Sequence, residues 1–273
     1  MVVFPNAKIN IGLNILSKRE DGYHNISSCF YPIPFCDVLE IVPSVDFRFT
    51  SSGIAIDGKP ENNLCVKAFQ LLQQHHDIGN VNIHLHKVIP MGAGLGGGSS
   101  DATFTLKALD KLFDLSLSIA QLQQYASQLG SDCPFFVKNT TVMAEGTGTE
   151  FRPCPVDLKG KYMVLIYPDL HISTQEAYSG VKPVQPEIEL EDILKEKPLQ
   201  EWPTQVKNDF EDSVAANYPV IEELKSTLYD QGALYASMTG SGSAIYGIFE
   251  EKTELNLHLS GIVWEGTLAS EVS

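Results

Sequence analysis

A run of five glycines within seven residues constrains this chain more than any other feature. The run lies in residues 90–102, PMGAGLGGGSSDA, between a predicted strand and a predicted helix. Because glycine has no Cβ, consecutive backbone N–H groups can approach an anion closely. The unpaired N–H groups and positive dipole end of the following helix should add to the same site. The stretch therefore predicts a polyphosphate-binding loop formed by Pro90, Met91, Gly92, Ala93, Gly94, Leu95, Gly96, Gly97, Gly98, Ser99 and Ser100.

Length and composition are typical of a globular enzyme with two lobes. The chain has 273 residues, of which 43% are hydrophobic and 19% charged. Its net charge of −15 disfavours extended contact with a nucleic-acid backbone. No apolar run approaches the roughly 18–20 residues that span a bilayer, and the N-terminus lacks the pattern of a secretion signal. We therefore expect a cytoplasmic protein, monomeric or homodimeric, that binds neither nucleic acid nor membranes.

The cysteines and histidines give no pattern of a disulfide framework or a metal site. The five cysteines are odd in number and contain no CxxC pair, which predicts reduced thiols. His84 and His86 share one face of a predicted strand and in principle offer two metal ligands. A solvated polar face is the favoured interpretation of this pair.

Residues 7–15, AKINIGLNI, alternate strictly between apolar and polar side chains. Ile9 and Ile11 belong to an apolar face that continues through Leu13 and Ile15, whereas Lys8 and Asn10 lie on the opposite face. This period of two predicts a half-buried strand whose polar face is available for function. A hairpin turn is predicted at residues 19–24, REDGYH, from its Asp-Gly pair.

Periodicity and turn residues predict the remaining elements. Glycines and prolines in residues 146–160 indicate a lobe boundary, and the charged, proline-containing segment 181–205 is expected to be a surface excursion. Strands are predicted at 27–34, 38–43, 46–51, 81–89, 141–146, 163–167, 234–238 and 244–249. Helices are predicted at 63–75, directly after the glycine-rich loop, from 118 to 130 and at 218–231.

Known phosphate-binding patterns leave several interpretations of the glycine-rich loop. A Walker A loop requires a lysine after its final glycine, and Gly97 is instead followed by Gly98 and Ser99. The spacing of Gly92, Gly94 and Gly97 does satisfy the dinucleotide pattern GxGxxG, which would imply hydride transfer. The preceding strand argues against it, because it alternates rather than forming a continuous apolar run. A non-Walker kinase loop and a ligand-free connection remain, and the entropy cost of five glycines disfavours the latter.

Four separated segments resemble the GHMP kinases, a family of small-molecule kinases. They are PNAKINIGLNI at 5–15, PMGAGLGGGSSDA at 90–102, LGSDCPFF at 129–136 and MTGSGSAIYGIF at 238–249. The REDGYH turn narrows the resemblance to the branch that acts on a cytidylylated alcohol. The resemblance implies an α+β fold with a ribosomal-S5-like N-terminal lobe, 1–154, which binds ATP, and a ferredoxin-like C-terminal lobe, 155–273. The active site is expected between the lobes.

The resemblance also implies a chemistry, in which ATP phosphorylates the 2-hydroxyl of cytidylylated methylerythritol. Asp132 matches the family's catalytic aspartate, and a single carboxylate can orient a hydroxyl and take its proton. Lys8 matches the lysine of the AKIN segment, where it would pair with Asp132 and meet the transferring phosphoryl group. The alternatives are that Asp132 merely caps a short helix and that Lys8 is solvated.

The predicted cytidine site consists of Asn10, Tyr23 and His24, with Tyr178 as a second aromatic residue. Stacking of an aromatic ring on a base is worth about 1–3 kcal/mol, and an imidazole can hydrogen-bond the cytosine edge. Tyr178 would then form a sandwich with Tyr23. A hairpin-turn tyrosine and a helix-surface tyrosine are the alternatives, since Ser173 to Glu176 also match a capping box.

Three further positions complete the predicted site. Ser99 or Ser100 would supply a hydroxyl to Mg²⁺, which needs few protein ligands when phosphates and water complete its shell. Asn63 matches a residue at the edge of the adenine pocket. Gly240 lies in a second glycine-rich loop, 239–243, which would approach substrate or phosphate, with a plain tight hairpin as the alternative. A homoserine- or mevalonate-type kinase and a non-catalytic binding protein of the same fold remain as alternative functions.

Overall fold

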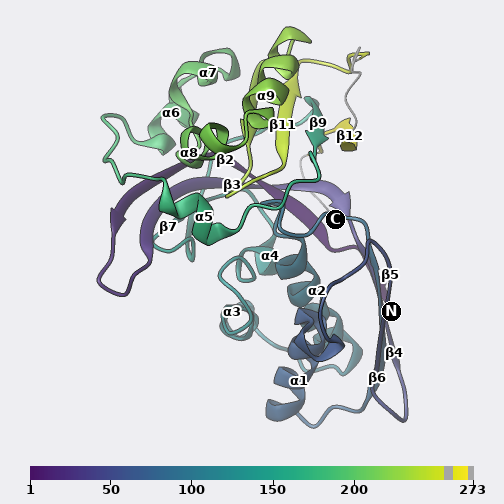
Figure 1. The fold of residues 1–273 in the computed structure, drawn as a ribbon. Coiled ribbons are helices and arrows are strands. Elements are labelled where there is room, and N and C mark those ends of the chain that lie inside the picture. The colour runs from purple at the N-terminus through teal and green to yellow at the C-terminus, as the bar shows by residue number, and fades with distance from the viewer. Residues whose placement is uncertain (255–260, 270–273) are drawn as a thin grey trace. The chain divides into compact units, whose positions relative to one another are not determined.

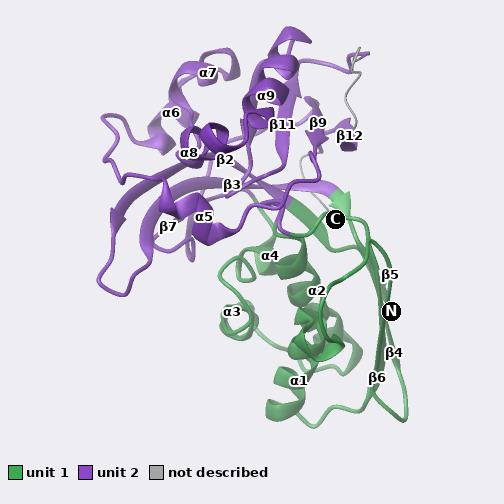
Figure 2. Ribbon diagram, viewed as in Figure 1, with its two compact units in different colours: residues 1–7, 35–91, 96–140 green, residues 8–34, 92–95, 141–273 purple. Residues whose placement is uncertain are grey.

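The computed structural model describes residues 1–254 and 261–269 (Figure 1). The chain divides into two compact units, each assembled from segments far apart in the sequence (Figure 2). Unit 1 contains residues 1–7, 35–91 and 96–140, and unit 2 contains residues 8–34, 92–95 and 141–273. The expected lobe boundary at residue 154 stays a prediction.

Unit 1 is a four-stranded sheet with helices packed on one face (Figure 2). The strand order is β1-β4-β6-β5, in which only the β5–β6 pair is parallel. Buried apolar residues of β4 and β6 form a core with those of α1 and α2. The elements are β1 (Val2–Val3), β4 (Val38–Pro43), β5 (Arg48–Gly53), β6 (Val81–Lys87), η1 (Pro60–Asn62), α1 (Leu64–His75), α2 (Gly97–Leu112), α3 (Ile119–Ser127) and α4 (Phe135–Lys138).

Local sequence signals explain why these elements form where they do. In β6 the inward side chains of Val81, Ile83 and Leu85 are buried and alternate with polar neighbours, as period two requires. Helix α3 begins with a complete capping box, in which Ser118 and Gln121 each bond the other's backbone N–H. The predicted strand and helices of this region are therefore confirmed.

Unit 2 contains two further antiparallel sheets. In one, the long hairpin β2–β3 continues into β7 and β8, and in the other the order is β10-β11-β9-β12. The strands are β2 (Asn6–Lys18), β3 (His24–Cys36), β7 (Val142–Glu145), β8 (Glu150–Pro153), β9 (Tyr162–Ile166), β10 (Tyr235–Met238), β11 (Ile245–Phe249) and β12 (Ile262–Thr267). The helical segments are α5 (Thr174–Ser179), α6 (Leu190–Glu196), η2 (Leu199–Glu201), α7 (Trp202–Gln205), α8 (Phe210–Asn217) and α9 (Val220–Asp230).

Two expectations for unit 2 are wrong. Strand β2 is not half-buried, because Lys8 and Asn10 on its polar face are only 4% and 2% exposed. The segment 181–205 is not a bare surface excursion, since it forms α6, η2 and α7. Leu190 and Trp202 are buried there, and the Trp202 ring packs edge-on against Tyr235. Charges and prolines on the outer positions concealed these apolar contacts in the sequence.

All five cysteines are free in the structure. In residues 1–254 and 261–269, no helix has both the length and the apolar character needed to traverse a bilayer.

Candidate functional site

The glycine-rich loop connects the end of β6 to the start of α2, as the sequence predicts. Gly96 is the N-cap residue of α2 and has φ +68°, a left-handed conformation that side-chain-bearing residues rarely adopt. Gly97 begins the helix, and a Cβ there would lie 2.9 Å from Cγ2 of Ile89. The loop therefore needs glycine at these positions to place the N-terminal N–H groups of α2 at its end.

Two buried polar atoms at the start of α2 have no hydrogen-bond partner among the described residues. They are Oγ of Ser100 and Oδ1 of Asp101. Ser99, the other predicted metal ligand, is half-buried. The Ser100 hydroxyl fits an anion or a hydrated cation bound there, whereas the Asp101 oxygen fits only a hydrogen-bond donor or a cation.

Lys87, at the end of β6, forms a buried ion triad that the sequence interpretation did not identify. Its Nζ lies 2.5 Å from Oδ2 of Asp37 and 2.6 Å from Oδ2 of Asp101. Desolvation opposes the Lys87 charge, but the two carboxylates offset it and raise the pKa of the ammonium group. Desolvation also raises the pKa of Asp101, to about 7, against the lowering effect of Lys87. The triad fixes the first turn of α2 to the strand that precedes the loop.

A pocket of about 240 Å³ opens beside this triad within unit 1. Asn63, the predicted adenine-edge residue, lines it, together with Met91 and Gly98 of the loop. Asn63 also has a structural role, because its Oδ1 accepts a hydrogen bond from the Cys65 N–H and caps α1. The lining also has apolar side chains, Phe49, Ile56, Pro60, Leu64 and Leu85, and polar ones, Ser51, Asp57, Lys59 and Asn62. This mixture suits a flat, partly polar ring.

Lys8 and Asn10 lie together on β2 in unit 2. Lys8 Nζ donates a hydrogen bond to Oδ1 of Asn10 and lies 4.7 Å from the centre of the Phe30 ring. Asn10 Nδ2 donates to Oγ of Ser28, 2.8 Å away on β3. Because these groups are buried, the Lys8 ammonium is shielded from water, which strengthens its interaction with any nearby negative charge.

Asp132 lies in unit 1, in the turn before α4, and is half-buried. The N-cap residue of α4 is Pro134, so Asp132 does not occupy the capping position that the alternative interpretation requires. Its backbone oxygen accepts a bond from the Phe135 N–H at 3.2 Å. The predicted pairing of Asp132 with Lys8 stays a prediction.

Three of the four predicted cytidine residues, Tyr23, His24 and Tyr178, lie at the β2–β3 turn and on α5, whereas Asn10 lies beside Lys8 on β2. The rings of His24 and Tyr178 stack directly, with centroids 4.7 Å apart and planes inclined by 20°. Tyr23 is 66% exposed, with its N–H bonded to Oδ1 of Asp21 in the turn. Tyr178 thus stacks on His24 in the structure, where a sandwich with Tyr23 was expected.

Gly240 lies in the 239–243 loop, in the connection from β10 to β11. The same loop also approaches the glycine-rich loop: a Cβ on Gly240 would lie 3.2 Å from Cα of Gly94 and 3.4 Å from Oδ1 of Asn10. A Cβ on Gly92 would lie 2.7 Å from Nδ1 of His171. Within unit 2, the structure thus brings Asn10, Gly94 and Gly240 together.

The sequence interpretation missed Lys87, Asp101 and His171 as neighbours of the loop. Lys87 carried a signal, because it follows Val81, Ile83 and Leu85 at the same spacing and so belongs to the buried face. His84 and His86 lie on the other face, where they bond hydroxyl groups of β5. The described residues contain no group of three or more side chains able to hold a metal ion.

Comparisons with known proteins show the family of this chain. The pattern described as GHMP kinases N terminal domain matches residues 63–139, and that described as GHMP kinases C terminal matches residues 190–257. The chain belongs to the GHMP kinase family. Its α+β fold, with the N-terminal and C-terminal domains of this family, is confirmed, and the resemblance seen in its motifs is correct.

Individual relatives extend the comparison over nearly the whole chain. A protein of Parabacteroides distasonis is 50% identical over 272 residues, covering 98% of this chain and 100% of its own. One of Cytophaga hutchinsonii is 52% identical over 255 residues, covering 93% and 94%. Both are named 4-diphosphocytidyl-2-C-methyl-D-erythritol kinase. A solved structure of 4-(cytidine 5'-diphospho)-2C-methyl-D-erythritol kinase has a TM-score of 0.77 and 32% identity, covering 92% of this chain and 91% of its own.

Proposed function

We propose that this GHMP kinase transfers the γ-phosphoryl group of ATP to the 2-hydroxyl of 4-diphosphocytidyl-2-C-methyl-D-erythritol. The observation that carries the proposal is the identity of about half of all residues, over more than nine tenths of the chain, with proteins of that name. Solved homoserine and mevalonate kinases share the fold at only 15–19% identity.

The loop from Pro90 to Ser100 would bind the ATP phosphates. Its glycines expose backbone N–H groups, and the start of α2 adds donors and a favourable dipole. The pocket beside Asn63 would hold adenine, which is flat and needs few polar contacts. When bound, Mg²⁺ would neutralise phosphate charge. Ser99 or Ser100 would hold it, and the unpartnered hydroxyl of Ser100 supports this assignment.

Asp132 would orient the acceptor hydroxyl and take its proton as the phosphoryl group arrives. Phosphoryl transfer depends mainly on positioning and on stabilising charge, so one such carboxylate suffices. Lys8 would stabilise the negative charge of the transferring group. Its burial against Phe30 and its bond to Asn10 support that role, because a desolvated ammonium group interacts strongly with developing charge.

The cytidine of the acceptor would bind beside the His24–Tyr178 pair. The stacked rings offer an apolar face and a ring nitrogen for the cytosine edge. Tyr23 is exposed at the adjacent turn and available to cover a base. Asn10 and Gly240 would then contact the part of the acceptor nearest the transferred phosphate.

The substitution Asp132→Asn tests the catalytic assignment. We expect turnover with ATP and the cytidylylated acceptor to fall by about 10²-fold or more, because Asn cannot accept the hydroxyl proton. ATP affinity, measured by calorimetry, should stay within about threefold. Asp114→Asn is a matched control, since Asp114 is exposed and its φ of +50° tolerates Asn. An unchanged rate in Asp132→Asn would exclude the proposed role.

The acceptor assignment needs its own comparison. Wild-type ATP turnover should be substantial with 4-diphosphocytidyl-2-C-methyl-D-erythritol and close to background with homoserine or mevalonate. Turnover with only a non-nucleotide alcohol would refute the assignment. ATP binding without turnover on any of these acceptors would favour a non-catalytic binding protein.

A further inference from the structure

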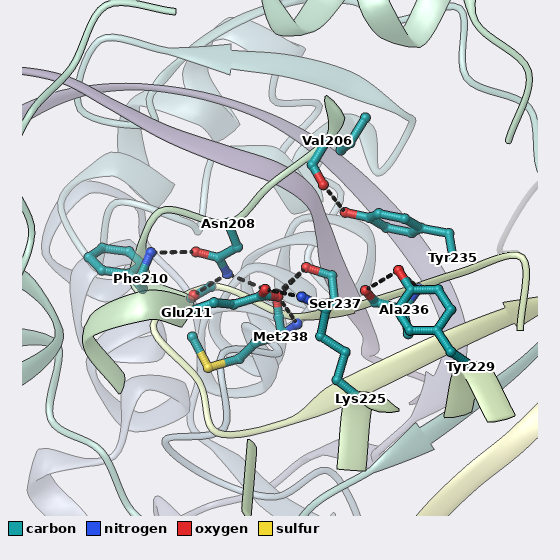
Figure 3. Close-up of polar contacts among 11 residues, drawn as sticks. Val206, Asn208, Phe210, Glu211, Lys225, Tyr229, Tyr235, Ala236, Ser237 and Met238 are labelled. Carbon is teal, nitrogen blue, oxygen red and sulfur yellow. Dashed lines mark hydrogen bonds and ion pairs between the residues drawn. The ribbon is translucent and has the colours of Figure 1, made fainter. Parts of the chain in front are cut away.

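Asn208 is a buried amide whose three hydrogen bonds all go to backbone groups. It lies between α7 and α8 and is only 2% exposed. Its Nδ2 donates to the backbone oxygens of Met238 and Gly240, at 2.8 Å each, and its Oδ1 accepts from the Phe210 N–H (Figure 3). Both carbonyl acceptors lie at the entrance to the 239–243 loop. The amide therefore fixes the backbone conformation with which this loop begins.

The backbone of the same segment is joined to β2. The Leu13 N–H donates to the Lys207 oxygen at 2.9 Å, and the Asp209 N–H donates to the Leu13 oxygen at 2.8 Å. Residue 208 thus pairs with Leu13 as a short parallel bridge. Strand β2 carries Lys8 and Asn10 five and three positions before Leu13, so a single segment holds both this strand and the 239–243 loop.

The loop in turn contacts β2 and the glycine-rich loop directly. Oγ1 of Thr239 accepts a bond from the Asn10 N–H at 3.0 Å and donates to the Gly94 oxygen at 3.1 Å. Gly94 is so close that a Cβ there would lie 2.0 Å from the Thr239 oxygen. A displacement of Thr239 or Gly240 would therefore disturb Asn10 and Gly94 as well.

A second buried side chain fixes the strand that enters the loop. Oε1 of Glu211 accepts bonds from the Ser237 hydroxyl and the Met238 N–H, at 2.7 Å each, and its Oε2 lies 2.6 Å from Nζ of Lys225 (Figure 3). Glu211 and Asn208 thus hold the N–H and the oxygen of the same residue, Met238. More than one buried side chain therefore fixes the backbone where β10 enters the 239–243 loop, as expected for a loop that must keep one geometry.

We propose that Asn208 is a positioning residue for phosphoryl transfer, which holds the 239–243 loop in register with β2 and with Gly94. The proposal rests on the proposed function, because it takes Lys8, Asn10 and Gly240 as parts of the reacting site. Asn208 acts only through the backbone groups it binds. Errors of about 1 Å in the position of reacting groups can cost about 10²-fold in rate.

The substitution Asn208→Ala removes both donors without adding charge. We expect amide hydrogen exchange in a peptide spanning residues 238–244 to become about tenfold faster, with no change in a peptide spanning β6 in unit 1. We also expect kcat to fall by about tenfold or more, with KM for ATP within about threefold. Asn217→Ala is the matched control, since Asn217 is exposed on α8, and it should alter neither measurement.

Three outcomes would overturn the proposal. The first is that amide hydrogen exchange at residues 238–244 is the same in Asn208→Ala as in wild type. The second is that exchange becomes faster throughout both units, which would mean general destabilisation. The third is locally faster exchange with an unchanged kcat. If Asn208→Ala does not fold, Thr239→Val, which removes bonds on the opposite side of the loop, should give the same local exchange and the same fall in kcat. The exchange readout needs no substrate, so a wild-type enzyme inactive on the cytidylylated acceptor would refute the proposed function separately.

Discussion

Cys29 and Cys154 show how a contact between two residues sets the chemistry of each. Their sulfur atoms lie 3.5 Å apart in unit 2, although 125 positions separate them in the sequence. Desolvation raises the pKa of the fully buried Cys29 thiol far above its usual range. The hydrogen bond with Cys29 lowers the pKa of Cys154, which is only partly buried. As pH rises, the Cys154 thiol therefore ionises before the Cys29 thiol.

This arrangement predicts which cysteine reacts first with an alkylating reagent. Cys36 is also partly buried, but desolvation and the charge of Asp37 raise its pKa to about 11. We therefore expect iodoacetamide at pH 8 to modify Cys154 at least about tenfold faster than Cys36, because the thiolate is the reactive form. Peptide mass mapping over time provides the measurement. Cys154→Ser should remove the fast phase, and labelling of Cys36 first would contradict the assignment.

At the scale of elements, the junction of β6 with α2 depends on a charge inside the core. Lys87 reaches from the last residue of β6 to Asp101 in the first turns of α2 and to Asp37. Asp101 has its pKa raised to about 7, chiefly by desolvation, so it keeps its proton in the folded chain well above the pH at which an unfolded aspartate ionises. A raised folded pKa adds stability at low pH, and this contribution is lost as pH rises through about 7.

Asp101→Asn should remove this pH dependence, because Asn does not ionise. The free energy of unfolding of the variant, relative to wild type, should improve by on the order of 1–3 kcal/mol between pH 5 and pH 8. Urea denaturation at the two pH values measures the change. Asp114→Asn, on the exposed surface, should follow the wild-type pH dependence. If the free energy of unfolding changes equally with pH in Asp101→Asn and in wild type, the raised pKa of Asp101 is contradicted.

Most helices and strands could be predicted from local sequence patterns. The site residues could be predicted only where they belong to a short motif. The glycine-rich loop, the β2–β3 turn and the helix that starts after Ser118 all have short-range signals, and the structure confirms those elements. The double burial of β2 was not predictable, because its cover comes from Tyr246 and Thr239, more than 200 residues away. The role of Asn208 likewise depends on long-range backbone partners, which no local spacing indicates.

For the molecule as a whole, charge opposes the proposed substrates. The net charge of −15 repels ATP and the cytidylylated acceptor, both of which are anionic. The distance over which charges act before salt screens them falls from about 30 Å at 0.01 M salt to about 8 Å at 0.15 M. We therefore expect kcat/KM for ATP to rise by about threefold over this range at constant free Mg²⁺, with kcat nearly constant. A kcat/KM that falls steeply with added NaCl would show that a local positive field dominates.

Because each unit is assembled from separate segments, the two units cannot be separated by one cut in the gene. The chain passes from one unit to the other at residues 7–8, 34–35, 91–92, 95–96 and 140–141. A gene fusion at any single point would therefore divide at least one of the two units. A single crossover therefore cannot exchange one whole unit and leave the other unchanged.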